Sequence, residues 1–369
     1  MLTPALLALL VTGVCPNGLT YPREVWTKAP SSNTAAVTAL EEYAFTLTGT
    51  DTGRKGIRTD GVVIIHKGKL IYEKYARGWN ENKRHLSWSV TKTFVNAFTG
   101  LAAKAGVLRL DDGICEHLKL QTPEACSKLT VRHLLEFSSG LDFKEVYEND
   151  SNQASSVLAM LYGEGHKDMA SFVAGHRFRD EPGTTYAYSS GDSTLLNAVV
   201  DAALVPKFGR DYAWKLLFNP IGMFSAVVER DQKGTLIGSS YLYATPRDLA
   251  RFGLLWQRDG CWDGRQLFPD AWVEKSKQVS EGFKKKPLYR DPNEVYAWQW
   301  TVNKAVPEVG QDTLPLKDIP GDAFAARGHW GQSITVIPSL DLVVVRVADD
   351  REKSFELNEF LKRAIEVAK

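Results

Sequence analysis

The chain has 369 residues, of which 44% are hydrophobic, and its 45 basic and 44 acidic side chains give a formal net charge of +1. This length and apolar fraction are sufficient for one large or two smaller domains with a buried core. The near-zero charge provides no overall field toward nucleic acid or an anionic membrane, so we expect a small-molecule or short peptide-like substrate and no nucleic-acid partner.

The chain begins with an apolar, uncharged stretch that ends at Cys15. The stretch is too short to span a bilayer but suits the core of an export signal, so we predict a signal segment at residues 1–20 and a periplasmic or secreted protein. The alternative is a short buried N-terminal segment of a cytoplasmic protein. Lipid attachment at Cys15 is less favoured because the preceding Val14 is bulky, and beyond such a signal or anchor we expect no stable membrane insertion.

The first predicted elements after this stretch are a helix and a hairpin. Apolar residues recur at helical spacing over residues 34–48, which predicts an amphipathic helix. Two β-rich runs, at 61–66 and 70–75, are separated by a short turn in which Gly68 is free to adopt a positive φ, so we predict a β-hairpin. A further helix is expected to carry Ser89 and to continue with an apolar face toward Ala102.

The rest of the chain divides into a helical part and a second β-rich part. Residues 111–244 consist mainly of helical runs joined by loops, and Thr245-Pro246 followed by Asp248 predicts a capped helix start. Strands are predicted at 296–302, 324–328, 334–337 and 342–347, and a last helix from about Phe355. We therefore expect an α/β lobe built from residues 34–110 and 245–369, with residues 111–244 as a helical lobe beside it.

The four cysteines show no spacing typical of a metal site, so we predict neither a metal nor another cofactor. In an exported protein, Cys115 and Cys126 are expected to form a disulfide that closes a short loop, which leaves Cys261 unpaired. Four separate thiols in a reducing compartment are the alternative.

Three segments carry residues suited to acyl transfer. Ser89 and Lys92 lie three residues apart in a predicted helix, so their side chains share one face, and an amine beside a serine helps to remove the hydroxyl proton. Tyr188 lies in a turn-rich loop and is a candidate proton shuttle. Farther along the chain, His329, Trp330 and Gly331 precede a predicted strand whose edge a substrate is expected to approach.

In this order the segments resemble the motifs of the serine β-lactamase and penicillin-binding-protein superfamily. Ser89-x-x-Lys92 matches its first motif, Tyr188-x-Ser190 its second and His329-x-Gly331 its third. Within the superfamily the chain is most similar to 6-aminohexanoate-dimer (nylon-oligomer) hydrolases and esterase-like members. The resemblance implies an α/β (α+β) fold with an antiparallel sheet of about five strands flanked by helices, and a mostly helical second lobe.

The resemblance also implies a role for each matching residue. Ser89 is expected to be the acylated nucleophile, while Lys92 and Tyr188 share the general base and acid roles, with the first base left open. The backbone N–H groups of Ser89 and Gln332 are expected to form the oxyanion hole, and His329 to orient the substrate.

Two departures from the superfamily pattern affect the expected substrate. Ser190 replaces an asparagine and His329 replaces a lysine, so Ser190, Trp330, His329 and Gly331 are predicted to bind a less anionic substrate than a β-lactam. No glutamate marks the deacylating base of another branch. We expect a carboxylesterase, amide-oligomer hydrolase or peptidase, with a β-lactamase or D-Ala-D-Ala carboxypeptidase, and a non-catalytic penicillin-binding or sensor module, as the alternatives.

Overall fold

The computed structural model describes residues 15, 21–22, 25–48, 50–147, 154–288, 291, 294–352 and 354–369. Except for Cys15, the predicted signal segment at 1–20 lies outside the described residues. None of the helices in the described ranges is long and apolar enough to cross a membrane.

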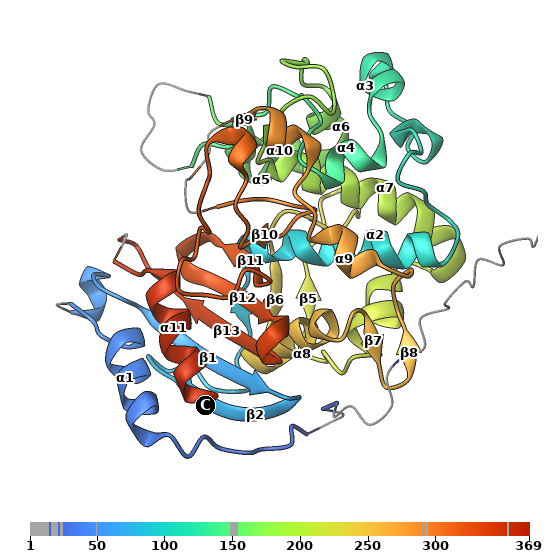
Figure 1. Cartoon of the computed structure of the whole chain (residues 1–369). Coiled ribbons are helices and arrows are strands. Elements are labelled where there is room, and N and C mark those ends of the chain that lie inside the picture. The colour runs from blue at the N-terminus through green and yellow to red at the C-terminus, as the bar shows by residue number, and fades with distance from the viewer. Residues whose placement is uncertain are drawn as a thin grey trace, which may run out of the picture.

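A six-stranded sheet forms the centre of the α/β part (Figure 1), with the strand order β10-β11-β12-β13-β1-β2 and antiparallel pairing throughout. Its strands are β1 (Thr59–His66), β2 (Lys69–Tyr75), β10 (Thr301–Val302), β11 (Phe324–Gly328), β12 (Gln332–Ile337) and β13 (Leu342–Ala348). The predicted hairpin is β1 and β2, with Lys67 and Gly68 at φ 51° and 73° in its turn. The predicted antiparallel sheet is confirmed, with six strands in place of about five.

Shorter strands pair outside this sheet. They are β3 (His85–Leu86), β4 (Tyr186–Ala187), β5 (Val227–Val228), β6 (Leu242–Ala244), β7 (Cys261–Trp262), β8 (Arg265–Gln266) and β9 (Pro287–Leu288). The β3-β6 pair links the segment before Ser89 to the segment before the helix that starts at Pro246.

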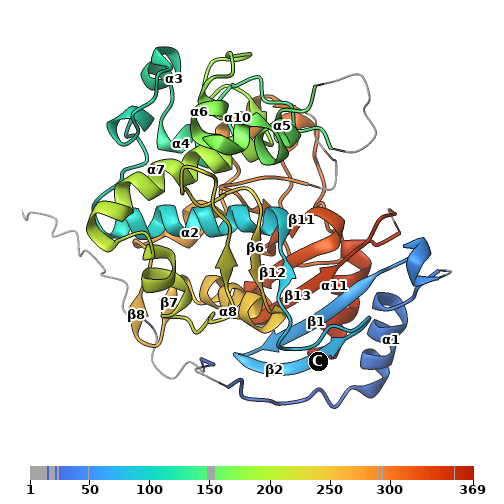
Figure 2. The ribbon, with the colours of Figure 1, turned by 180° about the vertical axis from the view of Figure 1, so that it is seen from behind.

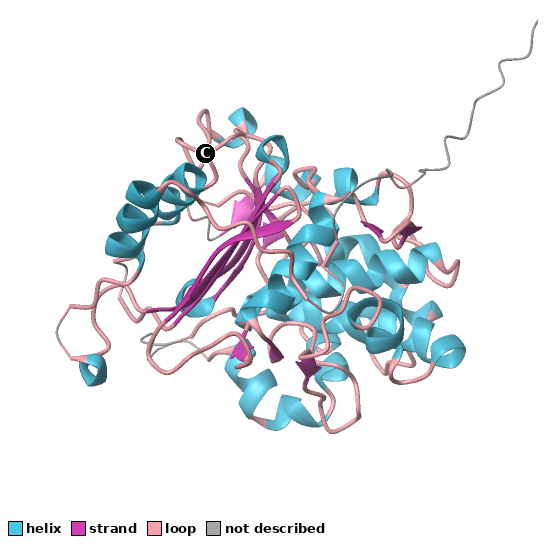
Figure 3. Ribbon diagram, turned by 90° about the horizontal axis from the view of Figure 1, so that it is seen from below, coloured by secondary structure: helices cyan, strands magenta, loops and turns pink. Residues whose placement is uncertain are grey.

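Helices cover both faces of the large sheet, which Figure 3 shows edge-on between two layers. The helices are α1 (Thr34–Ala44), α2 (Thr91–Lys104), α3 (Pro123–Lys128), α4 (Val131–Leu135), α5 (Ser156–Tyr162), α6 (Met169–Ala174), α7 (Ser190–Phe208), α8 (Pro246–Gln257), α9 (Trp272–Ser276), α10 (Glu281–Lys285) and α11 (Leu357–Val367). Helices α1 and α11 lie on the outer face, and α8 lies on the inner face.

The central strands are apolar on both faces because both faces are covered. In β1, Val62 and Ile64 belong to the core under α1 and α11, whereas Val63 and Ile65 belong to the core shared with α2, α7 and α8. Successive side chains of a strand point to opposite faces, so one apolar run supplies two cores.

Helix α8 begins where the cap residues predict. The Thr245 hydroxyl accepts a hydrogen bond from the Asp248 N–H at 3.3 Å, and Pro246 is the first helical residue. Gly253 brings this helix close to the sheet, since a Cβ there would lie 2.5 Å from Val343 Cγ1. The predicted helix start is confirmed.

Two predicted elements are shorter than expected. The helix predicted over 34–48 ends at Ala44, where Phe45 is its C-cap. The strand predicted at 296–302 is reduced to β10, because Gln299 has a positive φ of 61° and the Ala297 N–H donates to Trp300 O in a tight turn. Five residues of the predicted strand, 296–300, therefore lie outside the sheet ladder.

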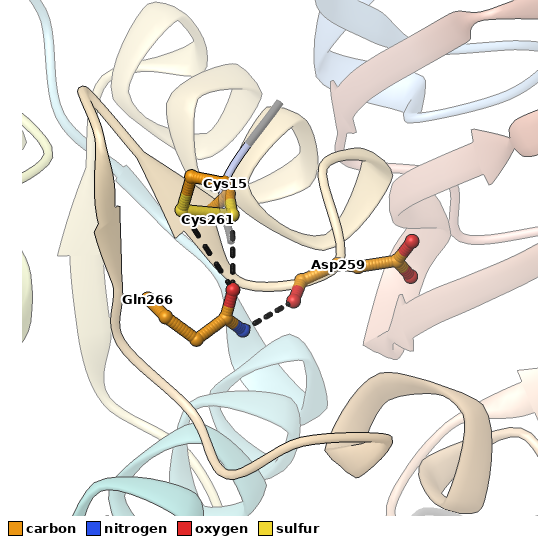
Figure 4. Close-up of a disulfide and its surroundings, with 4 residues drawn as sticks. All are labelled: Cys15, Asp259, Cys261 and Gln266. Atoms are coloured by element: carbon orange, nitrogen blue, oxygen red, sulfur yellow. Dashed lines mark hydrogen bonds between the residues drawn. A yellow bond between two sulfur atoms is a disulfide. The ribbon is translucent and has the colours of Figure 1, made fainter. Parts of the chain in front are cut away.

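Two disulfides join the four cysteines, Cys115 to Cys126 and Cys15 to Cys261. The Cys115–Cys126 pairing is confirmed, whereas the prediction that Cys261 stays unpaired is wrong. Figure 4 shows Gln266 beside the second bridge, with its Oε1 2.9 Å from Cys261 Sγ and its Nε2 donating to Asp259 O. Cys15 lies within the predicted signal segment, so the sequence alone does not indicate it as the partner of Cys261.

The helices of the central part of the chain gather on the far side of α2 from α8. In Figure 2, α4, α5 and α6 lie above α7, and α7 runs beside α2. The lobe boundaries at residues 110/111 and 244/245 stay a prediction.

Candidate active site

Ser89 lies in a tight turn that leads directly into α2. The turn, Trp88–Val90, is a 3-10 helix, and Trp88 within it has a positive φ of 48°. This conformation is unfavourable for a bulky residue and is maintained by its surroundings. The Ser87 N–H donates to Leu242 O at 2.9 Å, and the Thr91 hydroxyl donates to Trp88 O at 2.7 Å. The candidate nucleophile is therefore presented by a rigid support.

Lys92 is the centre of a buried hydrogen-bond network. Its side-chain Nζ lies 3.0 Å from Ser89 Oγ, 3.1 Å from Ser190 Oγ and 2.9 Å from Ser239 O, and the residue is only 1% exposed. Burial lowers the pKa of the Lys92 amine to about 8, and the negative charge of Glu145 acts in the opposite direction. An amine with this pKa can take up and release a proton near neutral pH.

Tyr188 borders the same network from the loop between β4 and α7. Burial and the negative charge of Glu145 raise the pKa of its phenol well above the usual value, and a hydrogen bond with Ser89 opposes this shift. The centre of the Tyr188 ring lies 5.0 Å from Lys92 Nζ. Tyr188 therefore keeps its proton at neutral pH and is suited to donate it.

Glu145 also joins the network, and no motif in the sequence points to it. Its Oε1 accepts hydrogen bonds from the hydroxyls of Ser190 at 2.6 Å and Tyr147 at 2.7 Å, and its Oε2 accepts from the Ser190 N–H at 2.8 Å. The loop that carries Glu145 matches no motif and lies far from Ser190 in the sequence. Glu145 contacts Lys92 only through Ser190, and the expectation that no glutamate marks the deacylating base of another branch stays a prediction.

The segment 328–332 approaches the Ser89 turn from the edge of the sheet. A Cβ on Gly328 would lie 2.4 Å from Ser87 O, so only glycine allows this approach. The His329 ring lies 5.8 Å from the Trp88 ring and stacks with Tyr147 at 5.5 Å, and the Trp330 ring lies 5.1 Å from Trp88. The structure therefore brings His329 and Trp330 together with the Ser89 turn.

A buried ion pair supports the 329–331 turn from below. Arg346 Nη1 lies 2.6 Å from Asp350 Oδ2 and donates to Gly331 O at 3.0 Å, while the Asp350 N–H donates to Trp330 O at 3.0 Å. Gly331 has a φ of 90°, and a Cβ there would lie 2.3 Å from Asp350 Oδ2. Gly331 is therefore required by packing, and its predicted role in substrate binding stays a prediction.

The side chain of Gln332 is used within the protein. Its Nε2 donates to Ala348 O at 2.6 Å and to His329 O at 3.0 Å, and its Oε1 accepts from the Ala348 N–H. These bonds fix the start of β12 beside the 329–331 turn. The predicted oxyanion role of the Gln332 backbone N–H, together with that of Ser89, stays a prediction.

Three aromatic residues around Ser89 have left-handed backbone conformations. Trp88, Tyr241 and Trp330 have φ values of 48°, 63° and 60°, and the Trp88 ring lies 6.3 Å from the Tyr241 ring. Bulky residues rarely adopt this conformation, and such outliers gather at functional sites. The cluster gives the site an aromatic border that suits uncharged parts of a substrate.

Two histidines away from this network pair with aspartates. His85 Nε2 lies 3.0 Å from Asp60 Oδ2, and His117 Nε2 lies 3.1 Å from Asp112 Oδ2. Within the described ranges, no group of three or more His, Cys, Asp or Glu side chains is placed to hold a metal ion.

Known proteins share this architecture. A family model described as Beta-lactamase matches residues 36–366. The 6-aminohexanoate-dimer hydrolase of Paenarthrobacter ureafaciens is 20% identical over 332 residues, which cover 86% of this chain and 80% of that protein.

Solved structures give the same result. A candidate 6-aminohexanoate-dimer hydrolase from Bacillus anthracis has a TM-score of 0.69 at 20% identity, covering 95% of this chain and 88% of that one. EstCE1, a hydrolase with promiscuous acyltransferase activity, has a TM-score of 0.64 at 14% identity, covering 91% and 98% of the two chains. At these identities the structural matches establish the fold.

Proposed function

The chain belongs to the beta-lactamase family, and on this premise we propose that it is a serine hydrolase that cleaves an ester or amide through a covalent acyl-enzyme on Ser89. The observation that carries the proposal is the contact between the Ser89 hydroxyl and a desolvated amine, since Lys92 Nζ lies 3.0 Å from Ser89 Oγ. A serine hydroxyl is a weak nucleophile until an adjacent base accepts its proton.

In the acylation step, Lys92 accepts the Ser89 proton while Oγ forms a bond to the substrate carbonyl carbon. The carbonyl π electrons move to oxygen, which the N–H groups of Ser89 and Gln332 are proposed to stabilise. When the intermediate collapses, the leaving alkoxide or amine takes a proton from Tyr188. Lys92 then returns its extra proton to Tyr188, so both groups end as they began.

In the deacylation step, water replaces the leaving group. Lys92 accepts a proton from water as its oxygen bonds to the acyl carbon, and the acid product departs when the C–Oγ bond breaks. Lys92 returns the proton that it took from water to Ser89 Oγ, so both groups end as they began, and the net reaction adds one water across the ester or amide. The raised pKa of Tyr188 supports its assignment as the acid, and the lowered pKa of Lys92 supports its assignment as the base.

The contacts at the second and third motifs favour esters or linear amides over β-lactams. The Ser190 hydroxyl is already engaged with Glu145 and Lys92, and His329 packs among aromatic rings. The relative named as a 6-aminohexanoate-dimer hydrolase supports a linear amide oligomer as one candidate substrate. A β-lactamase or D-Ala-D-Ala carboxypeptidase and a non-catalytic binding module remain the alternatives to be tested.

We further propose that the protein acts after export, in the periplasm or outside the cell. The Cys115–Cys126 disulfide supports this proposal, since such bonds persist in oxidising compartments. Peptide mapping without reduction after expression in a periplasm and in a reducing cytosol tests it. Free thiols at Cys115 and Cys126 in fully active protein would contradict it.

The central test is to locate the acylated residue. A fluorophosphonate, whose phosphorus bonds to the serine oxygen as fluoride leaves, should label Ser89, and Ser89→Ala should abolish labelling and hydrolysis of a p-nitrophenyl ester. A label on another residue would refute the mechanism, and stable acylation without turnover would favour the binding module. A panel of short esters, linear amide oligomers, D-Ala-D-Ala peptides and a cephalosporin then ranks the substrates.

A further inference from the structure

We propose that Glu145 is a positioning residue which acts through the Ser190 hydroxyl to direct the lone pair of the Lys92 amine at Ser89. The inference rests on the proposed function, in which Ser89 is the nucleophile and Lys92 the base. It adds a residue that none of the three motifs contains.

The Ser190 hydroxyl points its proton at Glu145. A carboxylate only accepts hydrogen bonds, so the 2.6 Å contact between Ser190 Oγ and Glu145 Oε1 uses the single Ser190 hydroxyl proton. Toward Lys92, 3.1 Å away, Ser190 Oγ can therefore only accept. Glu145 thus makes Ser190 an acceptor on its Lys92 side.

The Lys92 amine has three hydrogen-bonding neighbours, Ser89 Oγ, Ser190 Oγ and Ser239 O. A neutral Lys92 amine has two N–H bonds and one lone pair. The carbonyl of Ser239, at 2.9 Å, accepts one N–H, and Ser190 Oγ accepts the other. The remaining direction is toward Ser89 Oγ at 3.0 Å, so the lone pair faces the hydroxyl whose proton it must accept.

Hydrogen bonds to both oxygens hold the Glu145 carboxylate in place. Its second oxygen, Oε2, accepts from the Ser190 N–H at 2.8 Å, at the first residue of the 19-residue helix α7. The positive end of the helix dipole attracts the carboxylate there. The Tyr147 hydroxyl adds a bond to Oε1 at 2.7 Å, so the carboxylate has donors on both oxygens.

This geometry makes glutamine a disruptive replacement for Glu145. The amide has one accepting oxygen, whereas the site presents donors to both oxygens. If its oxygen faces the Ser190 N–H, its NH₂ faces Ser190 Oγ, which must then accept from the amide. The freed Ser190 proton turns to Lys92 and occupies the lone pair needed at Ser89.

The experiment measures the second-order rate of fluorophosphonate labelling, which reports acylation alone, together with kcat and KM for a p-nitrophenyl ester. The variants are Glu145→Gln, Ser190→Ala, the double variant and Ser89→Ala. Glu136→Gln is the matched control, because Glu136 is also a partly buried carboxylate that accepts a side-chain N–H, from Trp298 at 3.0 Å.

We expect Glu145→Gln to slow labelling roughly 10- to 150-fold, the factor for losing one hydrogen bond to a charged group, with kcat lowered and KM unchanged. Ser190→Ala removes the competing hydroxyl, so it should cost less, and it should rescue Glu145→Gln: the double variant should label at the rate of Ser190→Ala. Glu136→Gln should behave as wild type.

The outcomes separate the inference from the function on which it rests. Labelling or turnover that survives in Ser89→Ala refutes the proposed function itself. If Ser89→Ala is inactive, either of two results refutes the inference. One is a wild-type labelling rate in Glu145→Gln. The other is that Glu145→Gln slows labelling by the same factor in the Ser190→Ala background as in the wild type. Circular dichroism and Tm check folding. Should Glu145→Gln not fold, Ser190→Ala decides, because a wild-type labelling rate in that variant also refutes the inference.

Discussion

Two buried basic side chains, Lys92 beside Ser89 and Arg346 beside Gly331, have different surroundings. Lys92 is bound by two hydroxyls and one carbonyl, none of which carries a charge. Arg346 is 0% exposed and meets both oxygens of Asp350, at 2.6 and 3.1 Å, with the Phe355 ring 3.6 Å from its guanidinium.

The difference indicates what each cation does. A buried amine without a carboxylate in contact loses its charge readily, which suits a base, and the lowered pKa of Lys92 expresses this. A guanidinium paired with a carboxylate at two points stays charged and fixes geometry. In the proposed mechanism Lys92 is the base, whereas Arg346 holds the 329–331 turn in place through its hydrogen bonds to Gly331 and Asp350.

The largest expected effect is on the labelling rate and comes from removing the Lys92 amine. Lys92→Met should lower the fluorophosphonate labelling rate by roughly 10³-fold, because the Ser89 proton loses its acceptor. The free energy of unfolding should change by less than about 2 kcal/mol, since two hydrogen-bond acceptors lose a partner while no charge is left buried. Labelling kinetics and urea denaturation measure the two effects, and a large loss of stability with normal labelling would reverse the assignment.

Removing the Arg346 guanidinium should mainly lower stability. Arg346→Met leaves Asp350 buried without its partner, so the free energy of unfolding should fall by about 3–5 kcal/mol. Adding Asp350→Leu should recover most of this loss because the uncompensated charge disappears. Denaturation midpoints test this cycle. No recovery in the double variant would mean that the pair is not the source of the stability.

The pH dependence of the labelling rate and of stability should distinguish the role of Lys92 from that of Arg346. With a pKa of about 8, Lys92 is mostly neutral above that pH, so labelling should rise roughly 100-fold from pH 6 to pH 9 and level off. Since the pKa of Lys92 in the folded protein lies below the ordinary lysine value of 10.5, the unfolded chain binds more protons between these two pKa values, and stability should rise with pH across this window. Lys92→Met should remove the stability rise, whereas Arg346→Met should retain it.

The smallest effect is expected when one cation type replaces the other. Arg346→Lys keeps the charge but loses the planar fork that reaches Asp350, Gly331 and Thr59 together. The unfolding free energy should fall by about 1–2 kcal/mol, with labelling close to wild type. Thermal melts provide the measurement, and a loss as large as that of Arg346→Met would show that geometry outweighs charge.

Much of the scaffold could be predicted because its signals are local. Thr245-Pro246 specifies the start of α8, and the strand predicted at 324–328 agrees with β11 (Phe324–Gly328). The strand predicted at 296–302 failed because the left-handed Gln299 interrupts it, which composition does not reveal.

The site was predictable only where it follows a motif. Ser89, Lys92 and Tyr188 match ordered motifs, and the structure brings them together. Glu145 and the Arg346–Asp350 pair reach the site through contacts that only the folded chain creates. The same holds for the bond between Cys15 and Cys261, which are 246 residues apart.

The strand order has a consequence for synthesis. β1 (Thr59–His66) pairs on one side with β13 (Leu342–Ala348), which leaves a ribosome roughly 15–60 s later at about 5–20 residues per second. Until then one edge of β1 has unpaired backbone groups and an apolar surface that invites aggregation. A chain shortened before β13 would therefore keep this edge of β1 exposed.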